Sequence, residues 1–168
     1  MTLTLYYIIS AVFDLLVGGI ILFAALDDAK TRIVRPSIQW SLLGVSVAHF
    51  LFVLWTAYFG NLPEVVPFDA WELPLSGALM FAIYITLVLV FKSGIGGADT
   101  KVSSIMAMYL GLVPAIIMVV GHFVSAIAYV VFEKVKNHKH IASVPLMVFI
   151  GIGYILTLII KWSALLIH

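Results

Sequence analysis

Long apolar runs with very few charges are the feature that most limits how this chain can fold. A helix needs about 20 mostly apolar residues to cross a bilayer. Four runs reach this length, and they cover residues 5–26, 38–59, 73–91 and 144–160. In the whole chain 10% of the residues are charged, against about a quarter in soluble domains. The sequence therefore predicts an all-α polytopic membrane protein whose 168 residues form a single membrane-embedded domain.

A further apolar region, residues 102–132, is too long for one crossing, because a single helix of this length would extend about 46 Å. Residues 110–114, "LGLVP", supply a glycine and a proline where a helical hairpin could turn. Dividing the region there gives spans at 100–112 and 114–132, the first of them short. Six transmembrane helices are then expected.

The positions of the basic residues predict the orientation. Lys and Arg in short loops favour the cytoplasmic side of a membrane. With six spans and the N-terminus outside, all nine Lys and Arg residues except Lys161 lie on the cytoplasmic side. A five-span arrangement would place the lysines of the loop at 133–140 outside. The sequence thus favours a six-span, multi-pass protein of the cell membrane with its N-terminus outside.

Charge and cysteine content narrow the classes of function. The net charge of +1 gives no indication of nucleic-acid binding. The chain has no cysteine, which excludes disulfides, thiolate metal sites and thiol catalysis. The first apolar run lacks the basic start and small-residue cleavage site of a signal peptide, so we expect a retained span. The basic cytoplasmic loops fit the binding of lipid head groups.

Two aspartates that are far apart in the sequence are expected at the same membrane level. Asp28 follows the first span and Asp99 opens the fourth, both at the cytoplasmic edge. Carboxylates at close range do not both ionise readily, so one keeps a proton near neutral pH. The ionised member can act as general base on a water molecule while the protonated member polarises a carbonyl. This is the chemistry of aspartic proteolysis, and it needs no metal and no cofactor.

Glycines precede Asp99 in the segment "SGIGGADTK". Gly94, Gly96 and Gly97 allow the backbone to turn before the helix and let an extended peptide approach closely. The N-terminus of the helix would also favour charge on Asp99. The plainer interpretation is a loop that ends in an N-cap aspartate, and the residues alone leave both interpretations open.

Three segments carry a resemblance to a known family. The segment "GIGGADTK" resembles the GxGD signature of membrane-embedded aspartic proteases, in the form found in type IV prepilin peptidases. The segment "DAKTRIVRP", which begins at Asp28, looks like the first catalytic motif of that family. The segment "SVPLMVFIGIGY" is similar to the one that opens the family's last helix. The three segments occur in the family's order, and the resemblance covers most of the chain.

The resemblance implies a peptidase that removes the short basic leader from prepilin-like proteins at the cytoplasmic face. It implies that Asp28 and Asp99 are the catalytic pair. The chain lacks the cysteine-bearing insertion of bacterial members, so it looks more like the archaeal branch, which handles archaellins (preflagellins) and adhesion pilins. Lys101 and Arg32 are expected either to support the catalytic pair or to mark the membrane boundary.

The sequence departs from the family pattern at three points. Ala98 stands where the strict signature has glycine, "R-P" replaces "P-N" after the first motif, and the second proline of the last-helix motif is missing. These departures bear on substrate positioning more than on the chemistry. Asp28 is preferred over Asp27 because its spacing to the following basic residues matches the family's register. Asp27 is interpreted as an interfacial charge that balances Lys30 or Arg35.

Asp14, His49 and His122 are ionisable residues about 12–15 Å from the outer ends of their spans. Such groups normally face the interior of a helix bundle in pairs. We hypothesise that Asp14 hydrogen-bonds at least one of the histidines in a structural polar layer; otherwise each histidine binds a local backbone group. The same residues define an alternative function, a small transporter or channel whose path they line. A third alternative is a membrane subunit without catalysis, in which no single carboxylate matters.

Overall fold

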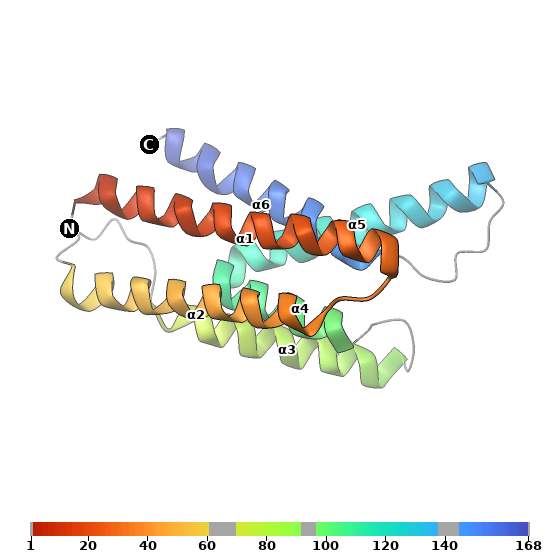
Figure 1. Cartoon of the computed structure of the whole chain (residues 1–168), viewed down its shortest axis with the longest axis horizontal. Helices are drawn as coiled ribbons and strands as arrows, with labels where there is room; N and C mark the ends of the chain where they lie inside the picture. Colours follow the sequence, from red (N-terminus) through yellow and green to blue (C-terminus); the bar gives the residue numbers. More distant parts are fainter. Residues whose placement is uncertain (1, 61–69, 92–96, 138–144, 168) are drawn as a thin grey trace.

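The computed structural model describes residues 2–60, 70–91, 97–137 and 145–167, and every regular element in these ranges is an α-helix. Six helices follow one another (Figure 1): α1 (Leu3–Thr31), α2 (Pro36–Phe59), α3 (Glu72–Phe91), α4 (Gly97–Leu110), α5 (Leu112–Asn137) and α6 (Leu146–Ile167). The all-α prediction is confirmed for the described part of the chain.

Five of these described helices, α1, α2, α3, α5 and α6, are long and apolar enough to cross a membrane. α4 has 14 residues and extends about 21 Å, less than the roughly 30 Å of a hydrocarbon core. The long helices turn large apolar side chains outward, among them Leu15, Trp40 and Leu89, which are 76%, 71% and 70% exposed. A continuous apolar surface of this kind marks contact with lipid. The chain is therefore a multi-pass helical membrane protein.

The helix break predicted within residues 102–132 is present. α4 ends at Leu110, and Gly111 has a φ of 83°, a left-handed conformation that glycine adopts without a Cβ clash. The break thus falls at the glycine, and Pro114 lies in the first turn of α5, where its missing N–H costs little. The Leu112 N–H donates to Oε1 of Glu72 (3.0 Å), so a carboxylate from α3 satisfies one of the first amides of α5.

α3 packs closely on α4, and α5 packs closely on α6. A Cβ at Gly77 of α3 would lie 2.8 Å from the Met108 Cβ of α4, and a Cβ at Gly153 of α6 would collide with the backbone of α5. The Ser76 hydroxyl donates to the Ala107 carbonyl (2.6 Å) and fixes the register of α3 against α4. Small residues and interhelical hydrogen bonds hold these helices together because lipid removes the hydrophobic drive for their association.

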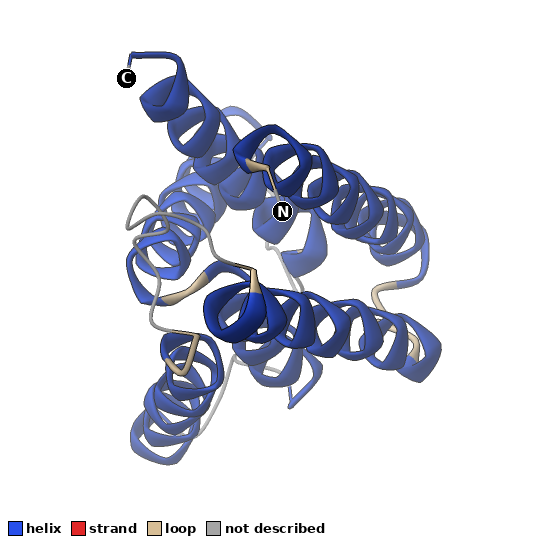
Figure 2. Ribbon diagram, turned by 90° about the vertical axis from the view of Figure 1, so that its left-hand side faces the viewer, coloured by secondary structure: helices blue, strands red, loops and turns tan. Residues whose placement is uncertain are grey.

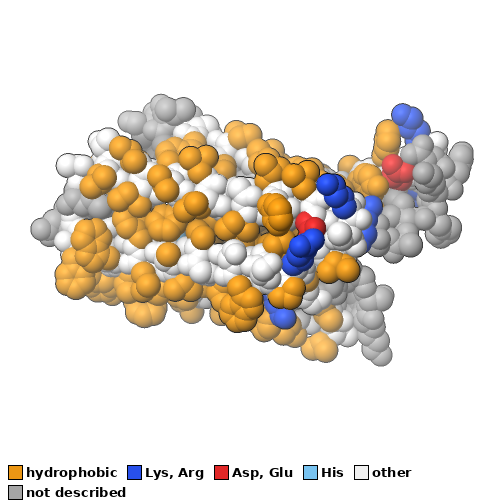
Figure 3. Space-filling view, viewed as in Figure 1, with side chains coloured by type: hydrophobic (Ala, Val, Ile, Leu, Met, Phe, Trp, Pro, Cys, Tyr) orange, Lys and Arg blue, Asp and Glu red, His pale blue; other side chains and the backbone are white. Residues whose placement is uncertain are grey.

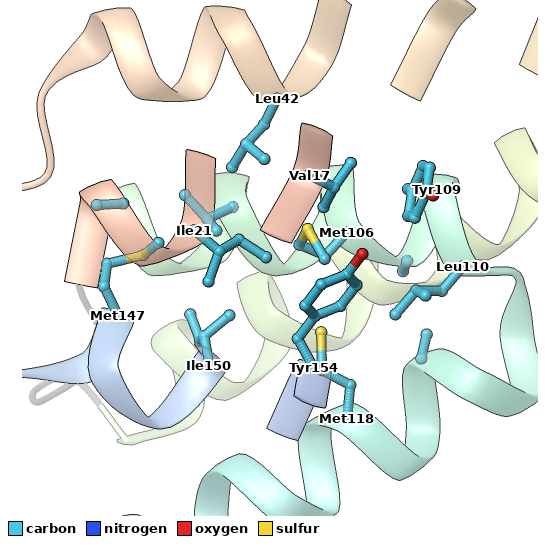
Figure 4. Close-up of a cluster of buried hydrophobic side chains, with 14 of the residues drawn as sticks. Val17, Ile21, Leu42, Met106, Tyr109, Leu110, Met118, Met147, Ile150 and Tyr154 are labelled. Atoms are coloured by element: carbon cyan, nitrogen blue, oxygen red, sulfur yellow. The ribbon is translucent and has the colours of Figure 1, made fainter. Parts of the chain in front are cut away.

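A buried apolar core, part of which Figure 4 shows, joins all six described helices. Its members with at most 2% exposure include Val17, Ile21, Leu42, Met106, Met118, Met147, Ile150 and Tyr154. α4 lies inside the bundle against α2, α3 and α5, and most of its residues are buried. Because α4 faces protein rather than lipid, it can carry the hydroxyl side chains of Thr100, Ser103 and Ser104 at depth.

Most of the basic residues gather at one end of the bundle. α1, α3 and α5 end there, and α2, α4 and α6 begin there (Figure 1). Figure 2 views the molecule from the opposite end, where both chain termini lie. Figure 3 shows Lys and Arg side chains gathered at the first end, beside a surface that is largely apolar. This end, termed the basic end, carries Lys30, Arg32, Arg35, Lys101, Lys134 and Lys136.

Candidate active site

Asp28 lies in the last turn of α1, at the basic end, and is 5% exposed. Its Oδ2 accepts a hydrogen bond of 2.9 Å from the backbone N–H of Met147, in the first turn of α6. The first amides of a helix have no partner within that helix, and the positive end of the helix dipole faces the same way. Asp28 therefore caps α6 from a different helix, and this contact fixes the orientation of its carboxylate.

α1 ends just after Asp28 because the chain turns at Arg32. Arg32 has a φ of 58°, a left-handed conformation that often follows a helix, and its N–H donates to the Asp28 carbonyl (2.9 Å). The Thr31 hydroxyl donates to the Asp27 carbonyl (2.9 Å) and accepts from the Ile33 N–H (3.3 Å). Hydrogen bonds thus hold the backbone around Asp28. The Arg32 side chain is exposed, and the contact that ties this residue to Asp28 is made by its backbone.

Asp27 faces a different neighbour. Its Oδ2 lies 2.8 Å from Nε of Arg35, and its Oδ1 accepts from Nη2 of Arg35 at 3.0 Å. This two-point ion pair joins the end of α1 to the start of α2, and it agrees with the interpretation of Asp27 as a paired interfacial charge. Successive helical residues point about 100° apart. Asp27 therefore contacts the α2 side of α1 while Asp28 contacts α6.

Asp99 is in the first turn of α4 and is partly buried. α4 begins at the basic end, so Asp99 lies at the same end of the bundle as Asp28 (Figure 1). Val102 of α4 and Ala24 of α1 lie about one turn further into the bundle than Asp99 and Asp28, respectively, and both belong to one buried cluster. The structure therefore brings the two aspartates to one end of the molecule, on helix ends that share a core.

Gly97 begins α4 beside open space, since a Cβ at this position would meet nothing within 4 Å. Packing within the described chain therefore does not require a glycine here. Gly94 and Gly96, which belong to the same motif, lie outside the described residues. The Lys101 side chain is exposed.

A groove of about 400 Å³ lies between α1 and α2. Apolar residues of α1 and hydroxyl residues at the start of α2 line it, among them Leu15, Gly19, Phe23, Ser37 and Ser41. Leu15 and Phe23 are 76% and 60% exposed, so the groove opens toward the lipid. Its α2 side lies next to the turn that joins the two helices at the basic end.

A second buried carboxylate, Asp14, lies in the half of α1 away from the basic end and is 4% exposed. Its Oδ1 accepts from the Tyr109 hydroxyl (2.7 Å), and its Oδ2 accepts from Lys161 Nζ (2.8 Å) and Trp162 Nε1 (3.1 Å). The Tyr154 hydroxyl donates to the Asp14 backbone carbonyl (3.0 Å). The ion pair with Lys161 compensates a charge that would be costly alone within a membrane.

The hypothesis that Asp14 hydrogen-bonds a histidine is wrong for the described residues. The Asp14 carboxylate oxygens accept hydrogen bonds from Lys161 of α6 and Tyr109 of α4. The Lys161 ammonium group is a stronger partner for a carboxylate than a neutral imidazole would be. His49 contacts this layer at Tyr109, whose ring centroid lies 4.6 Å from that of His49. Sequence analysis missed Lys161 and Trp162, although Lys161 was the one basic residue that the orientation left on the outer side.

His122 of α5 is 1% exposed and stacks on Phe123, with ring centroids 4.8 Å apart. Among the described residues, neither of its ring nitrogens has a hydrogen-bond partner. It therefore makes no hydrogen bond to Asp14, and the described residues do not form the predicted hydrogen-bonded trio. The local backbone partner considered for His122 is also not found in the described part of the chain.

The basic end combines an oriented carboxylate of α1, a second carboxylate at the start of α4 and open space at Gly97. Two carboxyl groups that converge on a water molecule and a carbonyl can serve as general base and general acid. Comparisons with protein-family models, curated proteins and solved structures found no match. Any statement of function therefore rests on the residues and their geometry.

Proposed function

We propose that this protein is a membrane aspartic endopeptidase that removes the short basic leader peptide of type IV prepilin-like proteins, such as archaellins and adhesion pilins. The observation that carries the proposal is the position of Asp28 and Asp99 on helix ends at the basic end of an apolar bundle. The segments around both residues resemble the catalytic motifs of prepilin peptidases, which supports the same assignment.

The proposed reaction is hydrolysis of a peptide bond by two carboxyl groups that share one proton. The ionised carboxylate takes a proton from a water molecule, whose oxygen attacks the scissile carbonyl carbon. The protonated carboxyl donates a hydrogen bond to the carbonyl oxygen as negative charge develops there. A proton then passes to the leaving nitrogen as the C–N bond breaks. The proposal assigns neither aspartate to the ionised or to the protonated role.

The contact between Asp28 and α6 supports a preorganised site. The Met147 N–H fixes Oδ2 of Asp28 at 2.9 Å before any substrate binds, so this carboxylate needs little reorganisation during the reaction. On the other side, the open space at Gly97 would let the backbone of an extended leader pass close to Asp99.

The groove between α1 and α2 supports a site for the apolar helix that follows the leader in such substrates. It opens toward lipid, from which a membrane-inserted substrate would enter. The cleavage point lies between leader and helix, so the helix would occupy the groove while the scissile bond lies near Asp28 and Asp99. The exposed Lys and Arg residues would repel a basic leader and are better suited to anionic lipid head groups.

We also propose six membrane crossings, with the N-terminus outside and the basic end in the cytoplasm. Lys and Arg concentrate on the cytoplasmic side of membrane proteins, and six of the basic residues share this end, among them Lys30, Arg35 and Lys134. α4 would provide the short fourth crossing, enclosed by its neighbouring helices rather than by lipid.

The proposal is tested by measuring leader cleavage with purified wild type and Asp→Asn variants. Asp28→Asn and Asp99→Asn should lower the cleavage rate by at least about a thousandfold, because each removes one member of the acid–base pair. Asn at position 28 keeps a side-chain oxygen that can accept from the Met147 N–H, so the fold should persist. Asp27→Asn is the matched control, and this variant should cleave the leader at the normal rate. The Asp27 carboxylate pairs with Arg35 and takes no part in the proposed reaction. A folded Asp28→Asn protein with wild-type activity would refute the proposal.

The alternative function is a small transporter or channel in which Asp14, His49 and His122 line a path. It predicts that Asp14→Asn abolishes activity while Asp28→Asn and Asp99→Asn are tolerated. The three donors that surround the Asp14 carboxylate are typical of a structural cluster, which makes the peptidase the better-supported function. A non-catalytic subunit would tolerate all of these substitutions.

A further inference from the structure

Two buried hydroxyl groups lie close together where α3 packs on α4. Tyr84 of α3 and Ser103 of α4 are each 1% exposed. Among the described residues, neither hydroxyl has a partner that satisfies hydrogen-bond geometry. A buried polar group without a partner destabilises a protein, and it is retained where another role requires it.

The register of α3 against α4 puts these hydroxyls beside Asp99. The two helices run antiparallel (Figure 1), and the Ser76 hydroxyl bonds the Ala107 carbonyl at one level. Tyr84 follows Ser76 in α3 by the same number of residues as Asp99 precedes Ala107 in α4. Tyr84 and Asp99 therefore lie at the same level, closer to the basic end. Ser103 follows Asp99 by about one turn and lies on the same face of α4.

The Tyr84 hydroxyl is close to both residues. The hydroxyl lies next to the Ser103 side chain and within the electrostatic field of the Asp99 carboxylate. The ring stacks on Phe123 of α5, with centroids 6.5 Å apart, which restricts its rotation. Tyr84 can therefore change its hydrogen bonding with a small movement of its hydroxyl or of the first turn of α4.

We propose that Tyr84 and Ser103 are positioning residues for Asp99, an inference that rests on the peptidase function proposed above. In the working site the Ser103 hydroxyl donates to the Tyr84 oxygen, and the Tyr84 hydroxyl donates to a carboxylate oxygen of Asp99. This chain of hydrogen bonds orients Asp99 toward the scissile bond. Each catalytic aspartate then has one orienting donor, the Met147 N–H for Asp28 and the Tyr84 hydroxyl for Asp99.

Tyr84→Phe removes only the hydroxyl group and tests this inference. Because that hydroxyl is unpaired in the described structure, its removal should leave the Tm unchanged or raise it. The kcat for leader cleavage should fall about tenfold with KM unchanged, which is the effect of one lost hydrogen bond on the transition state. The Tyr84→Phe, Ser103→Ala double variant should be no slower than Tyr84→Phe alone, because both hydroxyls act in one chain.

Tyr109→Phe is the matched control. Tyr109 is also a buried tyrosine of this bundle, 2% exposed, but its hydroxyl donates to Asp14 (2.7 Å) in the other polar cluster. Its loss should lower the Tm and leave the kcat of the folded protein near wild type. Wild-type kcat in Tyr84→Phe, or equal losses of Tm in both variants, would overturn the inference.

An infrared measurement separates this inference from the proposed function because it needs no substrate. The carboxyl bands of Asp99, isolated as the difference between wild type and Asp99→Asn, should shift in Tyr84→Phe and not in Tyr109→Phe. Shifted bands in a protein that cleaves no leader would support the contact and reject the peptidase. Suppose instead that the wild type cleaves the leader and that Tyr84→Phe has unchanged carboxyl bands and unchanged kcat. This result would reject the contact between Tyr84 and Asp99 but would still support the peptidase function.

Discussion

Carboxylates join distant parts of this chain at the scale of single residues. Asp28 accepts from the Met147 amide, Glu72 from the Leu112 amide, and Asp14 from the Lys161 ammonium. The partners are 119, 40 and 147 residues apart in the chain, whereas helix caps that can be recognised in a sequence lie within about three residues of their amides. The sequence predicted at which level of the bundle Asp14 and Asp28 lie, but it did not predict the group that binds each carboxylate.

The Asp14 cluster gives a prediction about stability. Asp14→Asn should lower the free energy of unfolding by about 1–3 kcal/mol, because it leaves the partly buried Lys161 charge without its counter-ion. Lys161→Met should also destabilise, by leaving the buried carboxylate uncompensated. The double variant should be more stable than the sum of the two single changes implies, since it leaves no isolated charge. Thermal unfolding in detergent measures all three, and strictly additive losses would argue against the ion pair.

At the scale of helices, packing against α2, α3 and α5 holds α4 in its position. It is too short to cross a membrane alone and carries several hydroxyl side chains, so its own sequence indicates membrane burial only weakly. The break before α5 could nevertheless be predicted, because a glycine with φ of 83° leaves a local signal. What could not be predicted is the close packing of α3 on α4 at Gly77, which sets the level of Tyr84 against Asp99.

The groove between α1 and α2 gives a prediction about substrate binding. Gly19→Trp should raise the KM for a full-length prepilin substrate roughly tenfold, with kcat unchanged, because the indole fills the groove. A Cβ at Gly19 meets nothing within 4 Å, so the bundle itself should be undisturbed. Gly44→Trp is the matched control, since Gly44 has equally open surroundings on α2 but does not line the groove. Equal KM values for the two variants would exclude the groove as the substrate site.

At the scale of the whole molecule, large apolar side chains cover much of the outer surface, while several polar side chains are buried beside the apolar core. Within the described ranges, the buried residues include Asp14, Ser46 and Thr157, while Leu15 and Leu89 are among the most exposed. The outer surface is thus more apolar than that of a soluble protein, because lipid is the solvent around the helices. The exposed charged side chains lie mainly at the basic end, so the two ends of the bundle differ in charge (Figure 3).

The proposed orientation is tested by labelling single cysteines, since the natural chain has none. Trp71→Cys, near the start of α3, should react with a membrane-impermeant maleimide on intact cells. Lys136→Cys, near the end of α5 at the basic end, should react only after the membrane is permeabilised. Both residues are exposed, so access to the reagent and not burial decides the result. Labelling of both from the same side would contradict the proposed topology.

The sequence by itself determined the all-helical, membrane-embedded architecture, the break between α4 and α5 and the clustering of basic residues at one end. These features arise from hydropathy, helix length and local backbone chemistry, which short stretches of sequence carry. Tertiary structure alone decided that Asp28 binds α6, that Lys161 and not a histidine pairs with Asp14, and that Tyr84 lies level with Asp99. Such contacts depend on which helix faces which and in what register, and interhelical packing sets this through groups that are remote in the chain.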